Sequence, residues 1–332
     1  MSKPKRVELI EHLPLESPFS VHVFVSHVCD FKCEYCLHSL SGEQLKSMDF
    51  RKEQMTYDVF IKLVDEAKKF NTIPKSVIFA GHGEPLTHPK IAEMIRYAKI
   101  QNIADRVEIV TNGSQLNREL SDSLIESGLS RLRVSIQGLS SEVYRKICGR
   151  KVDFDELVSG VRYFYENKQE TNVFVKIIDS ALSSPGDAER FHALFDHISD
   201  EIAVEHLFPF VNQINHDTLD MTGQLTKHGD GAMRHVDICA MPFYMLVVWP
   251  NGDVTGCCAT QPPIIFGNIL KDSLFDIWHG RIRRDFLAER ICGRVSNLIC
   301  KSCTVPDYGM QTGDYLDAYR RKLNEIFCVE DR

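Results

Sequence analysis

The sequence predicts an α/β fold built on parallel strands, and two observations lead to that prediction. Six short segments rich in Val, Ile and Phe alternate with longer segments whose apolar residues recur at helical spacing. Alternation of this kind requires crossover helices between parallel strands. Six units are too few for a closed eight-fold barrel, so the pattern by itself allows either a doubly wound sheet or a partial barrel.

The alternating segments occupy the first two thirds of the chain. Val59, Leu63 and Ala67 illustrate the helical spacing, and Asn117 is a candidate N-cap. The predicted strands are residues 21–26, 76–80, 106–111, 131–137, 172–178 and 201–206, and the predicted helices are residues 54–70, 88–101, 117–127, 154–167 and 187–198.

The pattern changes after Pro209. Residues 212–234 are polar and without a clear period, which indicates a linker or a substrate-side loop. Further on, residues 243–249 and 254–258 predict a hairpin around an Asn-Gly turn, and residues 274–290 predict one amphipathic helix carrying Trp278. We therefore expect four regions: a leader over 1–18, a strand–helix core over 19–210, a linker or loop over 211–236 and a second domain over 237–332.

Composition excludes several classes of protein. Hydrophobic residues make up 43% and charged residues 26%, as in ordinary globular proteins. The net charge of −7 argues against a general affinity for nucleic acid or anionic membranes. No apolar run approaches the ~20 residues of a membrane helix, and the N-terminus has no secretory apolar segment. We expect a cytoplasmic protein, in which clustered thiols are metal ligands or catalytic groups rather than disulfides.

Three of the eleven cysteines, Cys29, Cys33 and Cys36, form a C-x3-C-x2-C pattern directly after the first strand. Three thiolates within eight residues can converge on one metal centre. A zinc site would need a fourth ligand, for which His27 or His38 could serve. A cubane iron–sulfur cluster on three thiolates leaves one iron open to a small molecule. The loop after a strand is where α/β folds place their chemistry, and this favours the cluster.

This pattern, with Tyr35 before the last cysteine, resembles the signature of the radical S-adenosylmethionine (SAM) superfamily. The second predicted strand runs into Gly81-His82-Gly83-Glu84-Pro85, which resembles the family's Gly-Gly-Glu-Pro motif with His82 as a variation. The resemblance covers residues 19–210. It implies a partial (βα)6 barrel, a [4Fe–4S] cluster that binds SAM, and hydrogen abstraction by a 5′-deoxyadenosyl radical.

The same resemblance assigns residues to SAM. The family uses the glycine loop for the methionine amino group, and glycines let the backbone approach a ligand closely. A Ser-x-x-Gly pattern near the ribose matches Ser135 and Gly138, although Gln137 stands where Asp is common. The expected SAM-side residues are therefore Tyr35, Gly81, Gly83, Glu84, Pro85, Asn112, Ser135 and, for the SAM carboxylate, Arg150.

Polar residues on the later strands are candidates for substrate contact. Period two places Arg133, Ser135 and Gln137 on one strand face, which we expect to point into the barrel. Lys176 on the fifth strand, with Glu205 and His206 on the sixth, could reach the substrate, and these three are the candidate catalytic residues.

A second cysteine cluster follows near the C-terminus. Cys239, Gly252 and Cys257 are spaced as at the start of the auxiliary-cluster domain called SPASM, but residues 304–319 lack the further cysteines of the full pattern. The remaining set resembles the shortened "twitch" version with one auxiliary [4Fe–4S] cluster. Its expected ligands are Cys239, Cys257, Cys300 and Cys303; Cys258 could replace Cys257, and zinc is the alternative metal.

The twitch layout resembles that of a radical SAM dehydrogenase acting on an aminocyclitol. This implies oxidation of an alcohol in a small sugar or cyclitol substrate, with the auxiliary cluster as electron acceptor and an electron donor such as flavodoxin or ferredoxin. Two other radical reactions stay open: a redox-neutral epimerisation with Cys148 or Cys258 as hydrogen donor, and modification of a peptide. A non-enzymatic, metal-stabilised binding module is disfavoured by the ordered loop motifs.

Overall fold

The strands form one open sheet. The computed structural model describes residues 7–216, 225–229 and 231–328. Within these residues the strand order is β6-β5-β4-β3-β2-β1-β7-β8-β9, so β6 and β9 are free edges. The strands are β1 (Ser20–Val23), β2 (Ser76–Phe79), β3 (Arg106–Thr111), β4 (Arg131–Ile136), β5 (Asn172–Ile178), β6 (Glu201–Glu205), β7 (Met245–Val248), β8 (Asp253–Thr255) and β9 (Gly267–Asn268).

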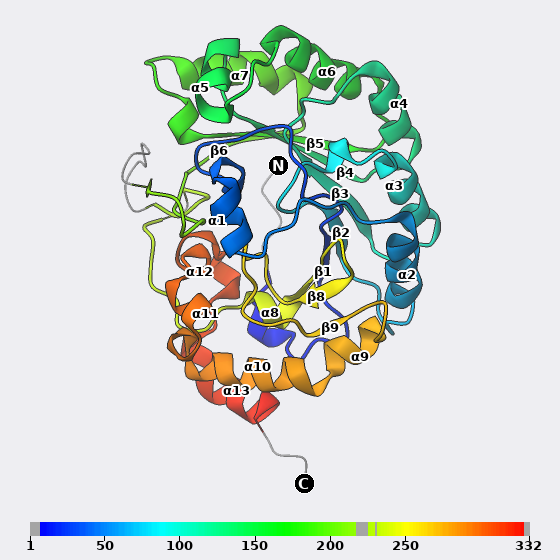
Figure 1. Cartoon of the computed structure of the whole chain (residues 1–332), viewed down its shortest axis with the longest axis vertical. Helices are drawn as coiled ribbons and strands as arrows, with labels where there is room; N and C mark the ends of the chain where they lie inside the picture. The colour runs from blue at the N-terminus through cyan, green and yellow to red at the C-terminus, as the bar shows by residue number, and fades with distance from the viewer. Residues whose placement is uncertain (1–6, 217–224, 230, 329–332) are drawn as a thin grey trace.

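Strands β1 to β6 are parallel, as the alternating pattern predicts, and the helices between them cover one face of the sheet, as the family resemblance implies. In Figure 1 the helices α2, α3, α4 and α6 form an arc outside the curved sheet. The helices are α1 (Gly42–Ser47), α2 (Tyr57–Ala67), α3 (Ile91–Ile100), α4 (Arg118–Glu126), α5 (Ser141–Cys148), α6 (Phe154–Asn167), α7 (Asp187–Phe195), α8 (Met241–Tyr244), α9 (Leu274–His279), α10 (Arg281–Cys292), α11 (Leu298–Ser302), α12 (Val305–Gly309) and α13 (Arg320–Phe327).

The two faces of β4 and β5 differ in chemistry. Val134 and Ile136 are fully buried in the core under the helices. Ser135 lies on the opposite face, where it pairs in register with Lys176 of β5. The polar face of β4 therefore points into the sheet's concave side, as the period-two pattern predicts.

The C-terminal region continues the same sheet. β7 runs parallel to β1, and β8 then pairs antiparallel with β7 through a turn in which Gly252 has φ +87°. This confirms the predicted Asn-Gly hairpin, although its first strand begins at Met245 because residues 241–244 form α8. The second cysteine cluster is thereby attached directly beside the strand that leads to the first.

The single helix predicted over 274–290 is wrong. The structure has two helices, α9 and α10, separated by Gly280 in an extended conformation (ψ 160°). A Cβ at Gly280 would lie 2.5 Å from the carbonyl oxygen of Asp276. The apolar spacing continues across the break, so periodicity alone does not reveal it. Trp278 of α9 is fully buried and donates from Nε1 to the Leu15 carbonyl at 3.1 Å.

The N-terminal segment packs against the C-terminal helices. Leu9, Ile10 and Leu13 belong to a second core cluster that includes Leu287 of α10 and Leu323 of α13. The segment expected as a leader thus contributes apolar residues to this core from position 9 onward.

Candidate functional site

The first cysteine site, defined as Cys29, Cys33 and Cys36, lies on the loop that follows β1. The glycine loop after β2 packs directly against residues 24–28, which lead from β1 into this site. A Cβ at Gly83 would lie 2.3 Å from the Ser26 carbonyl oxygen, and one at Gly81 would lie 2.5 Å from the Phe24 ring. Only glycine permits this approach of two loops, because any side chain would push them apart.

Two carboxylates brace the loops around this site. Glu84 is buried and accepts hydrogen bonds from Thr111 Oγ1 at 2.6 Å, the Asn112 backbone N–H at 2.7 Å and the Leu86 N–H at 2.9 Å. Burial outweighs these bonds and raises the pKa of Glu84 to about 7. Its carboxylate therefore ties the glycine loop to the end of β3.

Asp30, between the first two cysteines, accepts hydrogen bonds from polar groups of the loop after β3. It accepts from Asn112 Nδ2 at 2.9 Å and Ser114 Oγ at 2.6 Å, and it pairs with Arg150 at 3.2 Å. Burial opposes its ionisation, but these partners hold the pKa of Asp30 below its usual value. Asn112 and Arg150 therefore lie at the first cysteine site, engaged with Asp30.

A central cavity of about 720 Å³ opens on the concave side of the sheet. Its wall combines residues from β1, β4, β5 and β6 with residues from the C-terminal region. Of the predicted site residues, the cavity is lined by Tyr35, Cys36, Gly81, Ser135, Lys176, Glu205, His206 and Cys303; Glu84, Pro85, Asn112 and Arg150 lie outside its lining.

The predicted catalytic residues gather at one end of the cavity. Lys176 Nζ lies 2.6 Å from Glu205 Oε2, and Lys227 Nζ lies 3.5 Å from the same oxygen. Burial and repulsion from Lys227 lower the pKa of Lys176 to about 7, although Glu205 opposes the shift. Burial favours the neutral acid at Glu205, but Lys227 and Lys176 hold its pKa at about 2. His206 Nδ1 lies 2.8 Å from Asp179 Oδ2.

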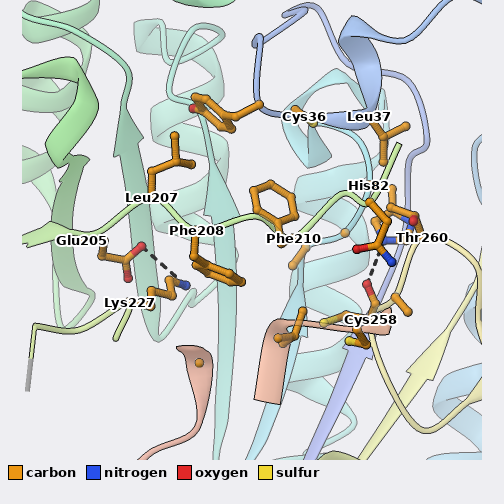
Figure 2. A pocket seen from close by; sticks show the side chains of 18 of the residues that line it. Cys36, Leu37, His82, Glu205, Leu207, Phe208, Phe210, Lys227, Cys258 and Thr260 are labelled. Carbon is orange, nitrogen blue, oxygen red and sulfur yellow. Dashed lines mark hydrogen bonds and ion pairs between the residues drawn. The ribbon is translucent and has the colours of Figure 1, made fainter. Parts of the chain in front are cut away.

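Sequence reasoning missed several residues that line this cavity. Figure 2 shows Phe208 and Phe210 between the Glu205–Lys227 pair and the His82–Cys258 pair. His22, on β1 between buried Val21 and Val23, could have been found from the period of two. Lys227 lies in the segment without a period, so the pattern carries no signal for it.

The second cysteine site, defined as Cys239, Cys257, Cys258, Cys300 and Cys303, surrounds a small cavity of about 40 Å³. The hairpin and α8 bring in the first three, and α11 with its C-cap brings in the others. Cys258 lines the large cavity as well, whereas Cys257 lines only the small one. The four expected ligands therefore meet at one place.

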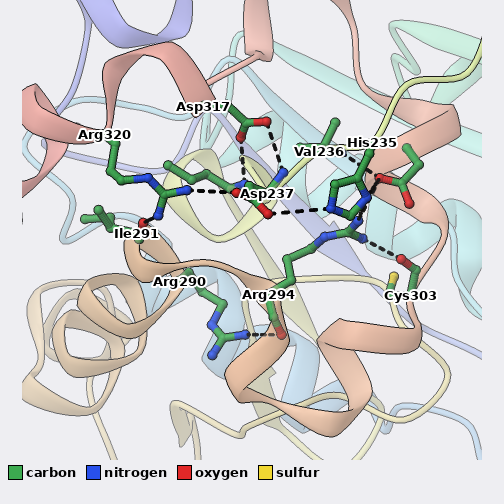
Figure 3. A network of polar contacts seen from close by, with 11 residues as sticks. His235, Val236, Asp237, Arg290, Ile291, Arg294, Cys303, Asp317 and Arg320 are labelled. Atoms are coloured by element: carbon green, nitrogen blue, oxygen red, sulfur yellow. Dashed lines mark hydrogen bonds and ion pairs between the residues drawn. The ribbon is translucent and has the colours of Figure 1, made fainter.

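Buried arginines surround the second cysteine site. Arg290 is fully buried and donates to Ser296 Oγ at 2.7 Å; Arg294 pairs with Asp307 at 2.7 Å and donates to the Cys303 carbonyl. Figure 3 shows Arg290 donating to the Arg294 carbonyl, and the Arg294 side chain reaching towards Cys303 and His235. Burial raises the pKa of the Cys300 thiol, and Arg290 opposes that rise.

His82 connects the glycine loop to the second cysteine site. Its Nε2 donates to the Cys258 carbonyl at 3.0 Å, the contact drawn in Figure 2. Its own carbonyl accepts from His38 Nε2, and its ring packs edge-on against Phe24 and Trp249. Burial lowers the pKa of His82 to about 3, so the ring is neutral at ordinary pH.

The donor sets fit iron–sulfur clusters. Among the described residues, no three His, Cys, Asp or Glu side chains converge closely enough to hold a single metal ion. Zinc holds its thiolates at ~2.3 Å, whereas a cubane separates its cysteines by a core of irons and sulfides. Cysteines arranged around a small cavity, and three thiols beside a glycine cradle, suit a cluster better than zinc.

Comparison with known proteins agrees with this geometry. A model of the radical SAM superfamily matches residues 23–179, and a model of the SPASM iron–sulfur cluster-binding domain matches residues 239–304. The chain is a radical SAM protein with a C-terminal SPASM domain. This membership implies a [4Fe–4S] cluster with SAM and auxiliary iron–sulfur, and the open, mostly parallel sheet is the family's partial barrel.

Similar proteins carry out different reactions. The GTP 3′,8-cyclase of Chlorobaculum tepidum is 27% identical over 71% of this chain and 58% of its own length. The dTDP-4-amino-4,6-dideoxy-D-glucose ammonia-lyase of Streptomyces venezuelae is 27% identical over 55% of this chain and 36% of its own length. The matches thus span 58% and 36% of the length of these two relatives.

Solved structures share the fold. The crystal structure of BtrN in complex with AdoMet and 2-DOIA has a TM-score of 0.57 and 19% identity, covering 95% of this chain and 99% of BtrN. At this identity the likeness extends to the fold alone. In the described part of the chain, none of the helices has the length and apolar character needed to span a bilayer.

Proposed function

We propose that the protein is a radical SAM oxidoreductase that converts an alcohol of a small sugar or cyclitol into a ketone. The central cavity carries this proposal, because Cys36 lies on its wall together with Cys258 and Cys303 of the second cysteine site. A substrate in this cavity lies between the two cysteine sites. That placement suits removal of a hydrogen atom on one side and transfer of an electron to the other.

The cysteines divide into two ligand sets in this proposal. Cys29, Cys33 and Cys36 hold the cluster that binds SAM, and Cys239, Cys257, Cys300 and Cys303 hold one auxiliary [4Fe–4S] cluster. When bound, the first cluster and SAM supply the hydrogen-abstracting radical, and the second supplies an electron acceptor. Cys257 is favoured over Cys258 as ligand because Cys258 also faces the substrate cavity.

The chain's part in the reaction is to position SAM and substrate and to remove a proton. Tyr35, Gly81 and Ser135 line the cavity near Cys36 and are proposed SAM contacts. Gly83, Glu84, Pro85, Asn112 and Arg150 shape the loops behind them. Holding both reactants in register supplies much of the rate enhancement of such a reaction.

Lys176 is the proposed general base. Its pKa of about 7 leaves a substantial fraction of neutral amine at neutral pH, which can take the hydroxyl proton of the substrate. Glu205, with a pKa of about 2, is too weak a base for this and instead orients the Lys176 amine. His206 lies on the same wall and is a proposed substrate contact.

A product assay tests the proposal. The anaerobically reconstituted protein, given SAM and a reductant such as flavodoxin or ferredoxin, should release 5′-deoxyadenosine and methionine. With a polyol substrate it should form one ketone per SAM consumed. Release of 5′-deoxyadenosine without any oxidised product, across sugars and cyclitols, would contradict the proposal.

A redox-neutral epimerase is the second candidate, because the Cys258 thiol lines the substrate cavity. A thiol in that position could return a hydrogen atom to the substrate radical. Reaction in deuterated solvent separates the two functions. An epimerase places solvent deuterium on the reacting carbon, whereas a dehydrogenase leaves its product unlabelled there.

A further inference from the structure

The end of the cavity formed by β5 and β6 carries an unusual group of charges. Lys176 comes from β5, Glu205 is the last residue of β6, and Lys227 reaches them from the segment 225–229. Both amines contact the same oxygen, Glu205 Oε2, at 2.6 Å and 3.5 Å. In Figure 2 the Glu205–Lys227 pair lies across the cavity from His82 and Cys258.

This end of the cavity has more positive than negative charge whenever Lys176 is protonated. Among the described residues that line the cavity, Glu205 is the one carboxylate, against the amines of Lys176 and Lys227. The pKa of Glu205 reflects the same excess of positive charge. Burial normally raises the pKa of a carboxyl, yet Lys227, Lys176 and His228 hold this one far below its usual value.

The two amines also have hydrogen-bonding capacity to spare. An ammonium group carries three N–H donors, and the described contacts of each amine are to Glu205. Donors such as these are almost always satisfied by a partner, whether protein, water or ligand, and the Lys227 side chain, 30% exposed, is open to water or to a ligand in the cavity. The 3.5 Å contact of Lys227 is long for a hydrogen bond, so its donors suit an acceptor in the cavity.

We propose that this end of the cavity binds an acidic group of the substrate, a carboxylate or a phosphate, with Lys227 as its main anchor. The inference rests on the proposed function, because it narrows the substrate from any small polyol to one that carries a negative charge. The side chains of Phe208 and Phe210 lie next to the pair and supply an apolar surface for the rest of the molecule.

An anion in this position also affects Lys176. Lys227 is one of the charges that disfavour protonation of the Lys176 amine. An anion on Lys227 weakens that repulsion and raises the pKa of Lys176, so the amine becomes neutral only at a higher pH once the substrate is bound. Recognition of the acidic group and the protonation state of Lys176 would then be linked through one pair of lysines.

Calorimetric titration of the cluster-loaded, SAM-bound protein tests this inference. SAM is included so that the probe cannot bind to an open iron. The probes are inorganic phosphate for the phosphate arm, glucuronate for the carboxylate arm and glucose as the neutral counterpart, with chloride fixing the ionic strength. We expect phosphate or glucuronate to bind at least tenfold more tightly than glucose.

Substitutions locate the binding. Lys227→Met should weaken binding of the preferred anion at least tenfold, and Lys227→Arg, which keeps the charge, should stay within threefold of the parent. Lys271→Met removes an exposed lysine away from the cavity and should change nothing. Equal binding of all three probes, or unchanged anion binding in Lys227→Met with a normal cluster spectrum, would overturn the inference.

The inference and the proposed function can fail separately. If neutral sugars are oxidised and anions bind no better than glucose, the oxidoreductase stands and the anion site is wrong. If Lys227-dependent anion binding is found but no SAM-dependent oxidation occurs with phosphorylated or carboxylated polyols, the anion site stands and the oxidoreductase is wrong.

Discussion

The two cysteine sites face the same cavity but differ in the buried charged groups beside their cysteines, which are carboxyl groups at the first and guanidinium groups at the second. Around the first, burial and the carboxylates of Glu84 and Asp30 raise the pKa of the Cys29 thiol, and Arg150 pairs with Asp30 at 3.2 Å. Around the second, Arg290 and Arg294 are buried against the cysteines and oppose the rise caused by burial. Beside the first site, the backbone of Gly83 packs against the backbone of the cysteine loop. Beside the second, the Arg294 guanidinium donates to the Cys303 carbonyl.

This difference bears on the direction of electron flow. Cluster potential depends on net charge, on hydrogen bonds to the sulfurs and on exposure. Nearby cations stabilise an added electron, and nearby anions destabilise it. We therefore expect the second cluster to be the easier to reduce, as an electron acceptor requires, and the first to be the stronger reductant. The predictions below test that comparison.

Removal of a ligand from the first site should have the largest effect. Cys33→Ala leaves two thiolates for a cluster that needs three, so we expect SAM cleavage to fall below detection. The measurement is 5′-deoxyadenosine release under reducing conditions. Cys292→Ala, at an exposed cysteine on α10, is the matched control and should cleave SAM normally. Normal cleavage in Cys33→Ala would refute the ligand assignment.

Removal of a ligand from the second site should separate cleavage from turnover. Cys300→Ala should retain SAM cleavage while ketone formation is lost, because the electron has no acceptor. Iron should fall from roughly eight per chain towards about four, as expected for two cubanes reduced to one. Full turnover in this variant would mean that the second site takes no part in the chemistry.

The two cysteine variants together isolate the clusters for a redox titration. Cys33→Ala retains the second cluster and Cys300→Ala retains the first. We expect the second cluster to have the higher midpoint potential, by about 60 mV or more, since each tenfold preference for a one-electron change corresponds to ~59 mV. Equal midpoint potentials, or a higher potential for the first cluster, would contradict the proposed electrostatic difference between the sites.

A smaller effect is expected from pH in the cavity between the sites. Burial, with repulsion from Lys227 and Arg133 and against the opposing effect of Glu205, lowers the pKa of Lys176 from 10.5 to about 7, and the amine must be neutral to act as a base. Turnover should therefore rise about tenfold per pH unit below 7 and level off above it. SAM cleavage without substrate, measured in parallel, should not follow this curve. Lys176→Met should lose turnover across the whole pH range, and turnover with an unchanged pH curve in this variant would contradict the assignment of Lys176 as the base.

The smallest effect is expected at the bridge between the sites. His82→Phe keeps the ring but removes the hydrogen bond to the Cys258 carbonyl, a contact worth about 1 kcal/mol, or roughly fivefold in an equilibrium. We expect a few-fold lower ratio of ketone to 5′-deoxyadenosine and an altered paramagnetic resonance spectrum of the second cluster. His82→Gln, which can restore the donor, should recover both; a normal spectrum in His82→Phe would contradict the bridging role.

Local pattern was enough for much of the fold. The predicted strands 106–111 and 172–178 and the helix 154–167 match β3, β5 and α6 residue for residue. In each, the apolar period agrees with burial against the neighbouring layer. The predicted N-cap Asn117 accepts from the Leu120 N–H, whereas α7 begins at Asp187 after Gly186 and has no side-chain cap.

The sequence by itself determined the family and the cofactors, because the cysteine spacing and the glycine motif that identify them each lie within a few consecutive residues. Only the tertiary structure decided how these parts meet: β7 beside β1, Lys227 against Glu205, and His82 against Cys258, which is 176 residues away. Such contacts depend on how distant segments fold back on one another. Local periodicity indicates which side chains of a helix or strand are buried and which face they lie on, but it does not indicate which residue from a distant segment will contact them.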